Sequence, residues 1–115
     1  MLMKELREKK KEIKDLLDAK FGSNGHRFVD TPRGVIFVRK PERLEYERYT
    51  DKMAADSNKY RQHILQLIRA CLIEELSPEE MLEACITDEP SLPGSIAGHL
   101  HEMAGDNPDR LSGKL

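Results

Sequence analysis

With 115 residues the chain has about the length of one domain, which excludes the several domains of a large enzyme. Hydrophobic residues make up 38% and charged residues 35% of the sequence, and no apolar run reaches the roughly 18 residues that a membrane-spanning helix needs, so we expect a soluble protein with one modest core. The net charge of -2 conceals two halves of opposite sign: residues 1–70 hold 17 Lys and Arg against 11 Asp and Glu, whereas residues 71–115 hold 2 against 10. This pattern favours halves that complement each other within one fold, copies that associate head to tail, or a basic face offered to an acidic partner.

Residues 1–20 predict a charged amphipathic helix. Aliphatic side chains recur near one face, and Lys, Arg, Glu and Asp occupy the others; the aliphatic positions are Leu2, Leu6, Ile13, Leu16 and Leu17. The segment has no apolar stretch of the kind found in a secretory signal, so we expect a cytoplasmic protein. The apolar stripe is narrow, so this helix should dock on another surface, and the Gly-rich and Asn-containing residues 22–25 should end it near Lys20.

Two β-rich runs follow, at residues 27–30 and 35–39, and they flank Pro32 and Gly34. This arrangement predicts a β-hairpin. An isolated hairpin is marginally stable in water, so it needs a helix packed on it or another chain's strand at its edge.

The remainder of the chain predicts helices. Pro41 opens the first, which carries Tyr46, Tyr49 and Met53 at helical spacing, and a stronger stripe then extends from Tyr60 to Leu72. The pattern of residues 42–75 permits one helix or two, and the polar residues around Ser57 favour a break. A capping box at residues 77–80 predicts that Ser77 caps a short helix, and a last helix should end at Gly105.

These patterns together predict a mainly α fold with one small β-hairpin, an α+β class. The expected order is an N-terminal helix over residues 1–20, a hairpin-plus-helices domain over residues 26–105 that includes a bundle of three to four helices, and a loose tail over residues 106–115.

The sequence offers no catalytic signature. Cys71 and Cys85 lie among apolar neighbours, as reduced core thiols do, and no C-x-x-C or H-x-x-x-H pair suggests a metal site. His99 and His101 are two residues apart, so on a helix they point in different directions. Phosphate-binding glycine loops are absent. We therefore expect no enzyme activity, no cofactor and no metal, and we do not expect nucleic-acid binding, because acidic residues interleave with the basic ones that follow the hairpin.

The order of these elements resembles the small tail assembly chaperones of tailed bacteriophages. The shared features, over residues 27–105, are a hairpin that ends in Val-Arg-Lys-Pro at residues 38–41, an acidic and tyrosine-bearing helix start at residues 42–46, the Cys71 that ends a helix, and a closing helix from Pro93 to Gly105. The charged helix that precedes the hairpin, and Glu42 after the proline, depart from that pattern. The resemblance implies a non-enzymatic protein of the host cytoplasm that binds the helical tape measure protein before the tail tube forms, and that self-associates.

On this interpretation the partner-binding residues are Tyr46, Tyr49 and Met53 on the helix together with Val35 and Phe37 on the hairpin, because a chaperone of an extended helix needs apolar anchors and a free strand edge. We expect a homo-oligomer that contacts the tape measure protein or another tail component and no membrane. Two alternatives remain: a structural connector or completion protein of a tail or tail-like particle, and a small DNA-associated regulator. A competing interpretation of the tyrosine stripe is that it belongs to the core.

Overall fold

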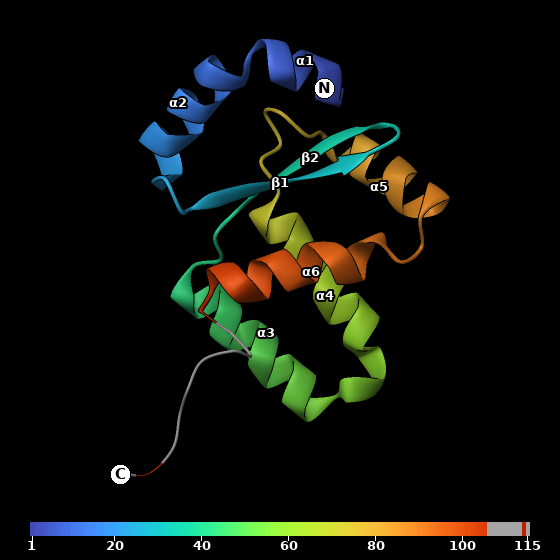
Figure 1. The fold of residues 1–115 in the computed structure, drawn as a ribbon. Coiled ribbons are helices and arrows are strands. Elements are labelled where there is room, and N and C mark those ends of the chain that lie inside the picture. The colour runs from blue at the N-terminus through green and yellow to red at the C-terminus, as the bar shows by residue number, and fades with distance from the viewer. Residues whose placement is uncertain (106–113, 115) are drawn as a thin grey trace.

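A computed structural model describes residues 1–105 and residue 114. It has the expected α+β class: helices α1 (Met3–Glu8) and α2 (Lys10–Phe21), an antiparallel hairpin of β1 (His26–Thr31) and β2 (Gly34–Arg39), and then helices α3 (Arg43–Ala55), α4 (Tyr60–Cys71), α5 (Glu79–Asp88) and α6 (Leu92–Met103). Figure 1 shows α1 and α2 on one side of the hairpin and the four later helices on the other. The tail expected at residues 106–115 lies outside the described residues, apart from residue 114.

The hairpin forms the middle layer because apolar side chains occupy both faces of β2. Val35 and Phe37 point to one face and Ile36 and Val38 to the other, as alternation along a strand requires, and all four are buried. The first pair packs in a cluster with Leu6, Ile13, Leu17 and Ile73, and the second pair joins the larger cluster that the later helices form. A strand that is buried on both faces has a continuous run of apolar residues in its sequence, as β2 does at residues 35–38.

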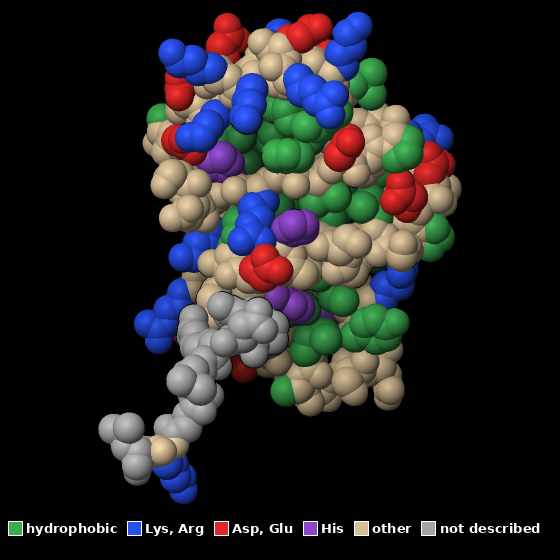
Figure 2. Space-filling view, in the orientation of Figure 1, with side chains coloured by type: hydrophobic (Ala, Val, Ile, Leu, Met, Phe, Trp, Pro, Cys, Tyr) green, Lys and Arg blue, Asp and Glu red, His purple; other side chains and the backbone are tan. Residues whose placement is uncertain are grey.

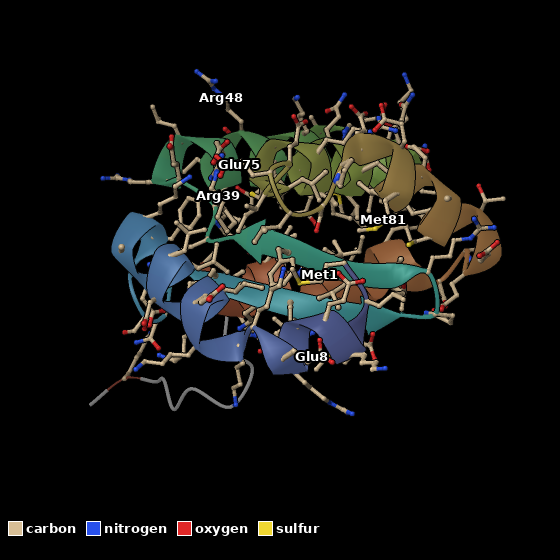
Figure 3. The ribbon with its side chains drawn as sticks, turned by 90° about the horizontal axis from the view of Figure 1, so that it is seen from above. Met1, Glu8, Arg39, Arg48, Glu75 and Met81 are labelled. Atoms are coloured by element: carbon tan, nitrogen blue, oxygen red, sulfur yellow. The ribbon has the colours of Figure 1, made fainter. Side chains whose placement is uncertain are left out.

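The turn of the hairpin depends on Gly34. Its φ of +155° lies in a region that L side chains rarely adopt, and a Cβ there would lie 2.9 Å from the Met81 sulfur and 3.0 Å from the Met1 carbonyl oxygen. The Thr31 hydroxyl donates to the Gly34 carbonyl at 2.6 Å and closes the two-residue loop between the strands. Seen from above, Met1 lies against the hairpin and Glu8 lies on the outer side of α1 (Figure 3).

The N-terminal segment forms two helices rather than the single helix predicted for residues 1–20. The helical dihedral angles break at Lys9, although Lys9 N–H still donates to Glu5 O at 3.0 Å and Ile13 N–H donates to Lys9 O at 3.0 Å, so the chain bends without unwinding. The bend lets Leu6 and Leu17 reach the same hairpin face. α2 ends at Phe21, where Gly22 takes a φ of +82°, close to the predicted end.

The segment 42–75 is two helices, with the break at the favoured position. A short 3-10 turn (Ser57–Lys59) joins α3 to α4, and the two helices pack against each other. At the start of α3, the Glu45 carboxylate accepts from Glu42 N–H at 2.9 Å and also binds the Arg39 guanidinium at 2.8 and 2.9 Å. These contacts tie the end of β2 to the first turn of α3.

The prediction that Ser77 caps α5 is wrong. The residue before α5 is Pro78, and no side chain caps this helix. Ser77 is instead fully buried beside β2, where its hydroxyl donates to Val35 O at 3.0 Å and accepts from Phe37 N–H at 2.8 Å. The hydroxyl therefore satisfies backbone groups on the outer edge of β2. The local sequence around Ser77 does not indicate this role, because the strand lies about 40 residues earlier in the chain.

Part of the opposite charge of the two halves is paired within the fold. Basic residues from the first half form ion pairs with acidic residues from the second: Lys20 with Glu75, Arg27 with Glu102, Arg33 with Asp88, and Arg69 with Glu79 and Glu83. Of the interpretations of the charge pattern, complementation within one fold thus has direct structural support.

Candidate functional site

An apolar groove of about 580 Å³ opens between α1–α2 and the hairpin. Its floor consists of Leu6, Ile13, Leu17 and Phe37, which belong to the smaller hydrophobic cluster, and Phe28 of β1 stands at its margin. Phe28 is 47% exposed, although its ring lies 6.4 Å from that of Phe37. Other large apolar side chains of the described residues are equally exposed, but Phe28 is the one among them that lines this groove.

Basic side chains frame this groove. Arg7, Lys10, Lys14 and Arg27 line it, whereas no Asp or Glu of the described residues does. Figure 2 shows a green hollow in the upper part of the molecule with Lys and Arg side chains around its upper margin. Two of these cations are already ion-paired, Lys14 with Asp18 and Arg27 with Glu102, so the unpaired positive charge on the rim comes from Arg7 and Lys10.

The charge asymmetry follows from helical spacing. Arg7, Lys10 and Lys14 are three and four residues apart, so they project from one side of the bent α1–α2 segment, flanking the buried positions Leu6, Ile13 and Leu17. Arg7 and Lys10 have no ion-pair partner among the described residues, so their charges are available to a ligand.

One end of the groove is fixed by a polar contact between α2 and β1. The Asp18 carboxylate binds His26 Nε2 at 2.6 Å and Lys14 Nζ at 2.7 Å. The hydrogen bond from Lys14, followed by that from His26, lowers the pKa of Asp18, so this carboxylate stays ionised and holds the end of α2 to the start of β1.

The outer edge of β1 is open next to this groove. On β2, the outer backbone groups are satisfied: Val35 N–H donates to Met1 O at 2.7 Å, and Phe37 O accepts from Ile73 N–H at 2.9 Å. In the strand register Phe28 lies opposite Phe37 and Asp30 opposite Val35, so the backbone groups of Phe28 and Asp30 point away from β2. Within the described part of the chain, nothing accepts from or donates to them.

The five residues predicted to bind a partner fall into two separate groups. Val35 and Phe37 are buried beneath α1–α2, with Phe37 on the groove floor. Tyr46, Tyr49 and Met53 lie on α3 in the helical layer, where Tyr49 is buried in the larger cluster and the other two pack against it. The structure therefore does not bring the two groups together.

The tyrosines of α3 form an aromatic cluster with α6. The rings of Tyr46 and Tyr49 lie 5.8 Å apart, and the Tyr49 hydroxyl is 2.9 Å from His101 Nε2. A hollow of about 230 Å³ lies nearby between α3 and α4, but Glu45 lines it together with Arg48 and Lys52, so it presents both signs of charge. This surface offers no preference for one ligand charge.

Both cysteines are buried, as predicted. Burial raises the pKa of the Cys71 thiol to about 12, so at neutral pH this sulfur is protonated and inert. The Cys85 sulfur lies 3.2 Å from the Thr31 hydroxyl, inside the contact between α5 and the hairpin. In residues 1–105 no group of three His, Cys, Asp or Glu side chains is arranged to hold a metal ion, and no helix there has both the length and the apolar character needed to cross a bilayer.

Comparison with protein-family models, with curated proteins and with solved structures finds no match for this chain. Sequence reasoning missed Arg7, Lys10, Lys14 and Phe28 as site residues, although the three basic residues share a helical face and that spacing is visible in the sequence. What the sequence does not show is that this face lies over a hairpin edge.

Proposed function

We propose that this protein is a non-enzymatic tail assembly chaperone that binds the tape measure protein during tail morphogenesis. The groove between α1–α2 and the hairpin is the observation that carries the proposal. It places the half-exposed Phe28 beside an apolar floor whose own side chains are only slightly exposed. A chaperone needs such a surface, because it must cover the apolar segments of its client until they assemble.

The order of sequence elements over residues 27–105 supports the identity of the client. The hairpin, the acidic start of α3 and the closing α6 are the elements in which the chain resembles tail assembly chaperones. Self-association along a long client belongs to the same proposal, since several weak contacts along one chain add up to a tight complex. Ion pairs within the fold already use part of the opposite charge, so we expect the client rather than charge alone to align the copies.

Co-expression with the tape measure protein of the same phage tests this function. We expect the client to become more soluble and to co-purify with the chaperone. Phe28→Asp should abolish co-purification, because it places a carboxylate on the apolar margin of the groove, whereas Leu44→Asp should leave it intact. Leu44 is the matched control, because it is 62% exposed on α3 and does not line the groove.

Absence of a complex with the wild-type protein would refute the proposal, as would equal loss in both variants. Recovery of the chain in purified particles at fixed stoichiometry would instead indicate a structural connector. Circular dichroism of each variant shows whether it remains folded.

A further inference from the structure

We infer that the open edge of β1 takes up an extended, acidic segment of a partner protein as a third strand, whose apolar side chains fill the groove. The inference rests on the proposed function only in taking the partner to be a protein. It names the binding mode and the chemistry of the bound segment.

The first step is the state of the strand edge. The backbone N–H and C=O groups of Phe28 and Asp30 face away from β2 and lack partners in the described residues, whereas those of Val29 face Ile36 within the hairpin. Neighbouring free groups on a strand are a template for another strand. The opposite edge, on β2, offers no such template because Met1, Ile73 and Ser77 already occupy it.

The second step is the position of the groove relative to this edge. Phe28 points to the α1–α2 side of the hairpin, the same side as Phe37, and both line the groove. Side chains of an added strand alternate between the two faces of the sheet, so every second residue of that strand would enter the groove beneath α1–α2. A helix lying in the groove would use the apolar floor but leave the backbone groups of β1 unpaired. The two features together therefore favour a strand.

The third step is charge. Arg7 and Lys10 project along the rim on the α1–α2 side and have no ion-pair partner among the described residues, whereas Lys14 is paired with Asp18. Carboxylates two residues away from the apolar residues of the incoming strand would lie on the same face of the sheet and would reach Arg7 and Lys10. A second copy of the chain is a poorer occupant: pairing two β1 edges about a two-fold axis would place the same basic rim of each copy on the same face and side by side.

Hydrogen exchange tests the binding mode directly. The probe is a synthetic peptide of about eight residues, a length typical of a strand, in which every second residue is in turn Val or Glu and the residues between them are Thr. On addition of this peptide we expect slower exchange at the amides of Phe28 and Asp30, which are open in the free protein. The amide of Val29 is the internal control, because it is already protected within the hairpin. Binding without protection at Phe28 and Asp30 would overturn the inference, as would preferential binding of a helical Leu and Glu peptide, or no binding of the alternating peptide.

Charge selectivity is tested with a matched pair of variants. Lys10→Glu should weaken binding of the Val and Glu peptide by roughly tenfold, whereas Lys11→Glu should change it less than about twofold, since Lys11 neighbours Lys10 in α2 but does not line the groove. Both variants have the same net charge. Equal weakening in both, or equally tight binding of the same peptide with Lys in place of Glu, would contradict the acidic partner. Protection that rises with protein concentration in the absence of peptide would show that a second copy fills the site.

A backbone variant separates the inference from the proposed function. Asp30→Pro removes the N–H that faces solvent and leaves the hairpin ladder intact, as proline on an edge strand does, while Asp30→Asn retains the N–H and removes the charge. We expect Asp30→Pro to abolish peptide and tape measure binding and Asp30→Asn to preserve both. If the tape measure protein bound both variants equally, strand addition would be refuted and the chaperone function would stand. If the peptide added to β1 but no tape measure protein bound, the chaperone function would be refuted and strand addition would stand. The exchange experiment on the wild-type protein decides the matter should Asp30→Pro unfold.

Discussion

Replacing Ser77 with alanine should destabilise the protein far more than the loss of one small hydroxyl suggests. The Ser77 hydroxyl is buried and bridges two backbone groups of β2, the Val35 carbonyl at 3.0 Å and the Phe37 amide at 2.8 Å. Alanine cannot replace either bond, and water has no access to the site. Each buried backbone group left unpaired costs about 1–3 kcal/mol, so for the two groups we expect a loss of about 2–6 kcal/mol in the free energy of unfolding.

Urea denaturation followed by circular dichroism measures this loss. A change of that size should lower the midpoint by roughly 1–3 M, since domains of this length have urea slopes of about 2 kcal/mol per M. Ser95→Ala is the matched control, because Ser95 is exposed on α6, and it should change stability by less than about 0.5 kcal/mol. A Ser77→Ala loss no larger than that of the control would refute the bridging role of this hydroxyl.

Further substitutions test other parts of the fold. Gly34→Ala should cost about 1–3 kcal/mol of unfolding free energy in thermal or urea melts, because its φ is positive and its Cβ would meet close neighbours, whereas Gly94→Ala should stabilise the protein slightly since nothing lies within 4 Å. The Cys71 thiol, whose pKa burial raises to about 12, should not react with a thiol reagent at neutral pH in the native protein but should react quickly in urea; fast native reaction would contradict its burial. Hydrogen bonds from Arg39 lower the pKa of Glu45 from its ordinary value of 4.5, so the stability that this carboxylate contributes is complete above that pH and is lost as the pH falls through the lowered pKa. Acid titration of unfolding should therefore be less steep in Glu45→Gln, and an unchanged slope would argue against this contribution.

Sequence periodicity predicted the elements that local patterns control. The hairpin follows from two β-rich runs around a Pro and Gly turn, and the break after α3 follows from a polar interval that offers no apolar contact. The bend at Lys9 was not predicted: the three lysines at residues 9–11 interrupt the apolar stripe, but no Gly or Pro there ends a helix, so the pattern favoured one helix. Ser77 shows the same limit. Its neighbours form a good capping sequence, but the hydroxyl is buried beside β2. There it forms hydrogen bonds with the strand backbone instead of capping α5.

The groove, too, could not be predicted from local sequence patterns. Its floor combines α1, α2 and both strands, so its position depends on how two separate elements dock. The basic spacing of Arg7, Lys10 and Lys14 was available in the sequence, but nothing local indicated that these residues overhang an open strand. Conversely, Tyr46 and Tyr49 had the spacing expected of an exposed binding stripe, yet the core also uses that spacing, and the structure places Tyr49 in the core.

The double-sided burial of β2 has a consequence for protein engineering. Odd-numbered positions 35 and 37 belong to the cluster beneath the groove, and even-numbered positions 36 and 38 belong to the helical layer. Alternate residues of this six-residue strand thus pack in two separate hydrophobic clusters. Substitutions at positions 35 and 37 could therefore change which ligands the groove accepts. They would leave the larger cluster, to which positions 36 and 38 belong, unchanged.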